Sequence, residues 1–205
     1  MPDDFDLSTL MAVRLKGRCA PADVSGATGA SEEDTAAKMG ALVDAGLLVE
    51  KNEKFRMTPE GKEKLGEMLA AERAEVDKDA LKEIYDDFEP LNSDFKQMVT
   101  DWQQRDGEPN DHSDADYDGE VLERLDGVND RFLPLLERIS AAAPRLATYP
   151  PRFSAALEKI HAGDHTWFLR PIIDSYHTVW FELHEELIQL SGLSREEEAA
   201  AGRAD

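Results

Sequence analysis

Basic side chains gather in the segment LLVEKNEKFRMT, residues 47–58, and they have the chemistry to bind a phosphate backbone. Lys51, Lys54 and Arg56 lie close together there, and ammonium and guanidinium groups are the usual partners of nucleic-acid phosphates. Upstream, Thr35 and Lys38 carry side chains that can meet base edges when their helix lies in a major groove. Three further cations could add a contact to the nucleic-acid backbone: Arg14, Lys16 and Arg18.

Acidic residues in the same region oppose contact with a polyanion. Glu32, Glu33 and Asp34 directly precede Thr35. Acids in the first turn stabilise a helix through its dipole, but they also occupy the place where a phosphate would dock. We therefore expect DNA contacts to come from Lys38 and from residues 51–56. The alternative is that the lysines of residues 51–56 only solvate a polar hairpin.

Four residues of the last third have the types that could ligate a metal ion: His161, His165, Asp174 and His177. Imidazole and carboxylate groups on facing helices form such sites in helical bundles. The spacing is loose, however, and a histidine among aromatic residues is more often hydrogen-bonded in a core or an interface. We therefore expect no metal ion and no cofactor, and a His/Asp metal-dependent enzyme is the least favoured alternative.

The acidic segment NDHSDADYDGE, residues 110–120, resembles the start of a calcium-binding loop. Asp114, Asp116, Asp118 and Gly119 match the D-x-D-x-D-G pattern, but the position of the closing glutamate is Leu125. A calcium loop needs that bidentate ligand. We therefore expect a solvated acidic loop whose carboxylates cap the next helix.

The composition favours a soluble cytoplasmic protein that does not enter a membrane. Of its 205 residues, 41% are hydrophobic, and Cys19 is the one cysteine, so no internal disulfide can form. No stretch approaches the roughly 18 apolar residues of a membrane span. The net charge of −21 is divided unevenly, with −5 in residues 1–75 and −16 in residues 76–205. Nucleic-acid binding would therefore need a local basic patch in the first third.

The first 75 residues predict three helices, a hairpin and a fourth helix. Ser31 is a good N-cap, Gly46 a helix stop, and Thr58-Pro59 a helix start. The expected elements are helices over residues 8–17, 21–28 and 31–46, strands over 47–49 and 55–57, and a helix from residue 58.

The remainder predicts long amphipathic helices, because apolar residues recur at alternating intervals of three and four. One stripe runs from Leu81 to Trp102, with Pro90 inside it as an expected kink or break, and another runs from Val121 to Ile139. A shorter helix follows Pro150-Pro151. The last long helix, expected over residues 172–190, carries two apolar stripes and should be central in its bundle.

Three features of this region resemble the winged-helix domain of MarR- and PadR-like transcriptional regulators. They are the turn Ala45-Gly46-Leu47-Leu48, the hairpin after it, and the run Met57-Thr58-Pro59-Glu60-Gly61 leading to Leu65. The resemblance covers about residues 1–72. It implies a helix-turn-helix whose hairpin is the wing. In these families the helices outside the winged helix commonly form a dimer interface.

The sequence thus predicts a mainly α protein, with a winged-helix domain over residues 1–75 and a helical bundle over residues 76–205 that dimerises or senses a ligand. The expected function is that of a winged-helix transcriptional regulator with weak or wing-mediated DNA binding, and not of an enzyme. The alternative is an adaptor whose winged helix contacts a protein partner and never meets DNA.

Overall fold

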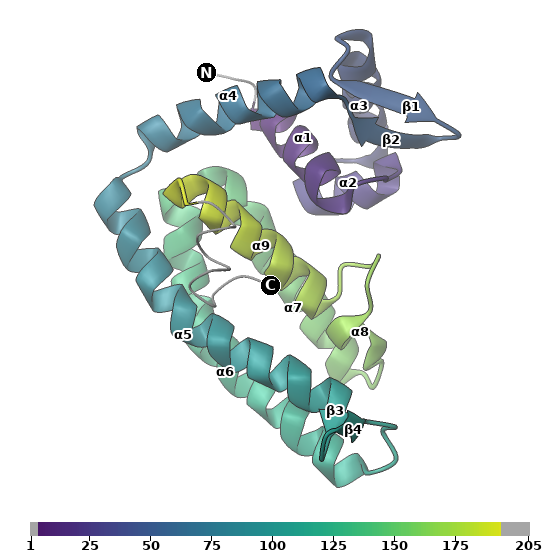
Figure 1. The fold of residues 1–205 in the computed structure, drawn as a ribbon, viewed down its shortest axis with the longest axis vertical. Coiled ribbons are helices and arrows are strands. Elements are labelled where there is room, and N and C mark those ends of the chain that lie inside the picture. Colours follow the sequence, from purple (N-terminus) through teal and green to yellow (C-terminus); the bar gives the residue numbers. More distant parts are fainter. Residues whose placement is uncertain (1–3, 194–205) are drawn as a thin grey trace.

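The computed structural model describes residues 4–193. The N-terminal module, residues 4–75, lies at one end of the longest axis, and the long helices extend from it to the other end (Figure 1). The elements of this module are α1 (Asp4–Lys16), α2 (Pro21–Thr28), α3 (Glu32–Asp44), β1 (Leu48–Lys51), β2 (Lys54–Met57) and α4 (Pro59–Glu75). Their order is the one that the sequence predicts, with α1 beginning four residues earlier than expected.

Local capping sets the ends of these elements. The Ser31 hydroxyl accepts a hydrogen bond from the Asp34 amide at the start of α3, and the Thr58 hydroxyl accepts one from the Gly61 amide at the start of α4. Gly46 ends the α3 turn with a φ of 76°, which glycine adopts without steric cost. A Cβ added to Gly61 would lie 2.1 Å from the Leu47 carbonyl oxygen. Only glycine therefore lets α4 pack against the turn between α3 and β1.

The second part of the chain, residues 78–193, is the helical bundle. Its elements are α5 (Lys78–Gln103), β3 (Gln104–Arg105), β4 (Glu108–Pro109), α6 (Ala115–Ala142), the 3₁₀-helix η1 (Pro144–Thr148), α7 (Tyr149–His161), α8 (Thr166–Leu169) and α9 (Tyr176–Ser191). Helix α5 continues through Pro90, and α6 runs antiparallel beside it (Figure 1). The mainly α class is confirmed, whereas the winged-helix assignment stays a prediction.

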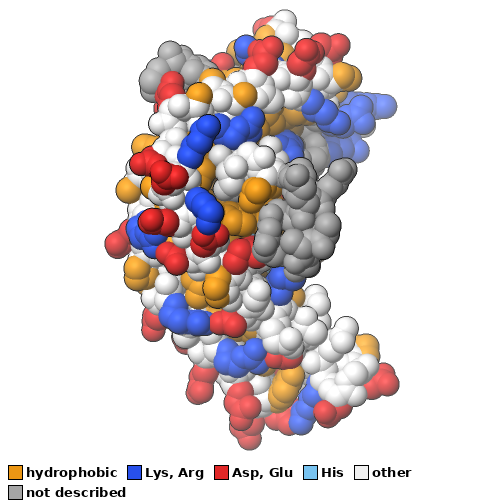
Figure 2. All heavy atoms as spheres, turned by 60° about the vertical axis from the view of Figure 1, so that its left-hand side comes forward, with side chains coloured by type: hydrophobic (Ala, Val, Ile, Leu, Met, Phe, Trp, Pro, Cys, Tyr) orange, Lys and Arg blue, Asp and Glu red, His pale blue; other side chains and the backbone are white. Residues whose placement is uncertain are grey.

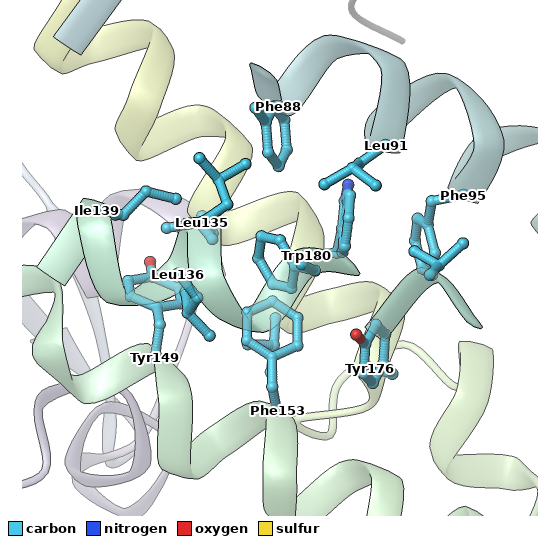
Figure 3. Packing of buried hydrophobic residues seen from close by; sticks show 14 of the residues in the cluster. Phe88, Leu91, Phe95, Leu135, Leu136, Ile139, Tyr149, Phe153, Tyr176 and Trp180 are labelled. Carbon is cyan, nitrogen blue, oxygen red and sulfur yellow. The ribbon is translucent and has the colours of Figure 1, made fainter. Parts of the chain in front are cut away.

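Both predicted apolar stripes are buried. All seven stripe residues of α5, from Leu81 to Trp102, and all six of α6, from Val121 to Ile139, belong to one hydrophobic cluster. Trp180 of α9 lies at the centre of this cluster (Figure 3). Its ring centroid is 4.4 Å from that of Phe95 and 4.6 Å from that of Phe132. Helix α9 is therefore central in the bundle, as its two stripes predict.

The expected start of the last long helix is wrong. Helix α9 begins at Tyr176, because the Ser175 hydroxyl caps it by accepting a hydrogen bond from the Thr178 amide. Ile172, expected in an apolar stripe, is 92% exposed and has a φ of 79°. The segment before Ser175 is a turn, so its apolar residues do not continue the helical pattern.

The buried apolar residues form two separate clusters. One lies within the N-terminal module, between Leu7 and Leu69, and the other within the bundle, between Leu81 and Leu190. The chain passes from one cluster to the other at the junction of α4 and α5. There Asp77 caps α5 by accepting hydrogen bonds from two backbone amides. Division into domains over residues 1–75 and 76–205 stays a prediction. Among the described residues, no helix is long and apolar enough to cross a membrane.

Candidate nucleic-acid interface

The β1–β2 hairpin presents its basic side chains on one face. Antiparallel pairing places Lys51 opposite Lys54 and Val49 opposite Arg56, and residues that pair across strands share a face. On the other face, Leu48, Phe55 and Met57 are buried in the module core, and Glu50 near the turn is exposed. We call the outward face, carrying Val49, Lys51, Lys54 and Arg56, the hairpin face.

A fourth cation joins this face from the segment between α1 and α2. Cys19 forms an antiparallel bridge with Phe55 of β2, so the residue before it lies beside the hairpin. The Arg18 guanidinium lies 3.5 Å from the Lys51 carbonyl oxygen, at the limit for a hydrogen bond. Lysine and arginine side chains gather over the hairpin at the upper right of Figure 2. Lys54 is partly neutralised by Asp23, at 3.4 Å.

Neither of the two α3 residues expected to face a DNA groove is available for that contact. Thr35 is fully buried, and its hydroxyl makes no hydrogen bond to any described residue. The expectation that Thr35 points outward is therefore wrong, because it lies on the same buried stripe as Met39 and Leu42. The Lys38 ammonium lies 2.6 Å from the Asp6 carboxylate and over the Phe5 ring. Helix α1 therefore holds the lysine that was expected to face the groove.

What α3 exposes instead is acidic or small. Its exposed residues are Glu32, Glu33, Asp34, Ala36, Ala37, Ala41 and Asp44. Alanine has no group that reads a base edge, and carboxylates can only accept hydrogen bonds. The acids of the first turn stabilise the helix dipole. This face is poorly suited to direct readout of DNA sequence.

Lys16, one of the three cations proposed to add a backbone contact, is occupied elsewhere. Its ammonium lies 2.9 Å from Glu182 and 3.1 Å from Asp174 of the bundle. Arg152 of α7 reaches the same two carboxylates, at 2.5 Å and 3.0 Å. We call these four residues the junction ion cluster. The expectation for Lys16 is wrong, whereas Arg14 and Arg18 are exposed.

The titration behaviour of the junction ion cluster follows from its pairing. Burial alone would lower the pKa of Lys16, but Glu182 and Asp174 raise it above its ordinary value. Burial alone would raise the pKa of the Asp174 carboxyl, but Arg152 and Lys16 hold it below its ordinary value. Lys16, Arg152 and Asp174 are therefore charged near neutral pH. The cluster ties α1 to α7 and α9.

A second ionic contact joins the two parts of the molecule. Arg145 of η1 donates to both oxygens of Glu72 in α4 and both oxygens of Glu186 in α9, at 2.8–3.0 Å. Sequence reasoning missed this contact and the burial of Glu182 and Glu186. The sequence did contain a signal, namely three glutamates on a helix that is apolar on two faces. Glutamates buried on such a helix require cationic partners.

The four metal-ligand candidates are not gathered into one site. His161 pairs with Asp126 at 2.8 Å, His165 packs against Trp102, and His177 stacks on Phe95. Asp174 belongs to the junction ion cluster. Among the described residues, no group of three or more His, Cys, Asp or Glu side chains is arranged to hold a metal ion.

The acidic segment caps a helix, as expected. The Asp114 carboxylate accepts hydrogen bonds from the Asp116 and Tyr117 amides and begins α6. Asp116 and Asp118 therefore lie on the helix rather than in a calcium-type loop. Cys19, the one cysteine of the chain, is buried against Phe55, and burial raises the pKa of its thiol to about 11. It is therefore protonated, and poorly nucleophilic, near neutral pH.

Comparisons of the chain with protein-family models, with curated proteins and with solved structures find no match. The functional assignment therefore depends on the geometry of the candidate interface.

Proposed function

We propose that this protein is a winged-helix transcriptional regulator of the MarR/PadR type whose DNA contacts come from the wing. The order of helices and hairpin supports the proposal, as does the isolated bridge between Cys19 and Phe55, which holds the segment between α1 and α2 beside β2. The resemblance at residues 45–48 and 57–61 points the same way. In this proposal the hairpin is the wing, and the bundle dimerises or senses a ligand.

The observation that carries the proposal is the hairpin face. Lys51, Lys54 and Arg56 share one face, and Arg18 lies beside them. In a chain with a net charge of −21, four cations on one small surface are the arrangement that local phosphate binding requires. Four phosphate contacts would give a slope of about −3.6 for log K against log salt, and a loss of affinity of about 10²-fold between 50 and 200 mM salt.

The proposed binding is to the backbone and is largely independent of sequence. Phosphate contacts position a protein, whereas base contacts specify the site. The α3 face lacks base-reading donors, and Lys38 is paired with Asp6. Specificity would then come from DNA shape or from the spacing of two modules in a homodimer, about 34 Å for one helical turn.

A second candidate function is a protein-interaction adaptor, and the α3 face favours it. All seven exposed residues of α3 are acids or alanines, which suits a basic partner better than a polyanion. In this alternative the hairpin face only keeps the hairpin solvated.

Binding of the full chain to a random-sequence DNA duplex in 50 mM salt distinguishes the two functions. We expect binding by the unaltered chain, and its loss when Lys51→Glu and Lys54→Glu are combined. The matched control is Lys159→Glu, an exposed lysine of α7 outside the N-terminal module. A chain that does not bind duplex at this salt concentration contradicts the regulator and leaves the adaptor as the better account.

A further inference from the structure

The β3–β4 hairpin lies at the far end of the bundle from the β1–β2 hairpin (Figure 1). An open groove lies beside it, lined by residues of α5, α6 and α8 and of the segment between β4 and α6. It consists of two hollows of about 530 and 700 Å³ that share Trp102, His112, His165 and Thr166. We call this surface the tip groove. Hollows of this size fall within the range that small-molecule ligands occupy.

His112 is held in one orientation at the wall of the tip groove. Its Nδ1 lies 3.0 Å from the Asp118 carboxylate, and Asp118 also accepts a hydrogen bond from the Asn110 amide at 2.9 Å. The Asn110 side-chain oxygen accepts a hydrogen bond from the His112 backbone amide. Nδ1 also lies 3.3 Å from the Asn110 side-chain nitrogen, so contacts with two residues fix the orientation of the ring. The other ring nitrogen, Nε2, makes no hydrogen bond to any described residue, and His112 lines both hollows, so Nε2 can form a hydrogen bond with a group in the groove.

Aromatic rings line both hollows. The Trp102 ring centroid is 4.6 Å from that of His112 and 5.9 Å from that of His165. The side chain of His112 is 42% exposed and His165 is exposed as well. Their faces are therefore available to a planar ligand, since planar rings stack favourably on aromatic side chains.

One side of the tip groove also carries donors for an anion. Gln103 and Arg170 line the hollow of about 530 Å³, and none of the described residues lining that hollow is Asp or Glu. The adjoining hollow of about 700 Å³ is lined by Asp118, whose carboxylate is paired with His112. A guanidinium is well matched to a phosphate or carboxylate.

We propose that the tip groove binds a small ligand that combines a planar ring, a hydroxyl and an anionic group, the combination found in nucleoside monophosphates. The ring stacks on His112 or His165, the anionic group pairs with Arg170, and the hydroxyl forms a hydrogen bond with His112 Nε2. The site is independent of DNA binding, because it lies at the other end of the molecule from the hairpin face. No proton is transferred and no bond is broken.

Isothermal titration of the full chain with three probes tests the proposal. AMP carries all three groups, adenosine lacks the phosphate, and ribose 5-phosphate lacks the ring. We expect AMP to bind at least about tenfold more tightly than either of the other two, since each lacks one set of contacts. Failure of AMP to bind at millimolar concentration overturns the proposal, and so does equal binding of AMP and adenosine.

Three substitutions locate the site. His112→Asn removes Nε2 while keeping a residue that tolerates the positive φ of 57° at this position. Arg170→Gln removes the cation from an exposed side chain. Both should weaken AMP binding at least about tenfold, with unchanged circular dichroism. His161→Asn is the matched control, because His161 also pairs with an aspartate but lies outside the groove. AMP binding that survives both of the first two substitutions places the ligand elsewhere and overturns the assignment.

Discussion

The Lys38 ammonium of α3 lies 2.6 Å from the Asp6 carboxylate of α1. This contact turns a residue of the expected DNA-reading helix into one that joins two helices of the same module. It is the main reason for placing DNA contacts on the hairpin face rather than on α3. It also separates two properties, module stability and DNA affinity, that substitutions can measure independently.

Replacing Lys38 with alanine should leave affinity for duplex DNA within about twofold, because the proposed phosphate contacts come from other residues. The same change should lower the free energy of unfolding by about 0.2–1 kcal/mol, the usual worth of a partly exposed ion pair. DNA titration and urea denaturation measure the two effects. A tenfold loss of DNA affinity in a stably folded variant would show that α3 does meet DNA.

Replacing Thr35 with valine should stabilise the protein or leave its stability unchanged. The Thr35 hydroxyl is buried without a hydrogen bond among the described residues, and an unsatisfied buried polar group costs about 1–3 kcal/mol. Valine has the same shape without the hydroxyl. Thermal denaturation checks this, with Thr178→Val as a comparison in which a hydrogen-bonded hydroxyl is removed. Clear destabilisation by Thr35→Val would mean that the hydroxyl has a partner.

Replacing Glu182 with glutamine should lower the free energy of unfolding by about 3–5 kcal/mol, as expected when one partner of a buried ion pair is removed. Glu182 is 3% exposed and contacts both Lys16 and Arg152. Its loss leaves two buried cations sharing Asp174. Glu158→Gln, an exposed change on α7, is the control. Equal stability of the two variants would mean that the junction ion cluster is solvated.

The contribution of Asp174 to stability should depend on pH in the acidic range. Its folded pKa lies below the ordinary value of 3.8, through Arg152 and Lys16, which oppose the effect of burial. A lowered folded pKa gives stability that is present above the unfolded pKa and is lost as pH falls through the folded one. The difference in unfolding free energy between the unaltered chain and Asp174→Asn should therefore be constant above about pH 5 and shrink below pH 4. A difference that does not change between pH 2 and pH 6 contradicts this account.

Local sequence signals predicted much of the fold. Helix α2 follows from Pro21 and Gly29, α3 from Ser31 and Gly46, and the two long helices from their apolar stripes. Each signal depends on residues within one or two helical turns of one another, so it can be recognised in a single sequence. The start of α9 was misplaced because Ile172 and Ile173 continue an apolar pattern that the Ser175 cap interrupts.

The contacts that decide the candidate site were not predictable in the same way. The partners of Lys16 are 158 and 166 residues away in sequence, and Lys38 pairs with a residue of another helix. Whether a lysine is free or paired depends on tertiary packing, which periodicity does not report. Lys51, Lys54 and Arg56 share a face only in the observed strand register. That register is known only once the residues that pair across the hairpin are known.

The most direct test of the central claim is the salt dependence of binding to a random-sequence DNA duplex between 50 and 200 mM salt. The account predicts a slope of log K against log salt of about −3.6 for the unaltered chain, less steep by about two units in the Lys51→Gln/Arg56→Gln double variant. A slope that is the same in both proteins, or no binding at 50 mM salt, would contradict DNA binding through the hairpin face.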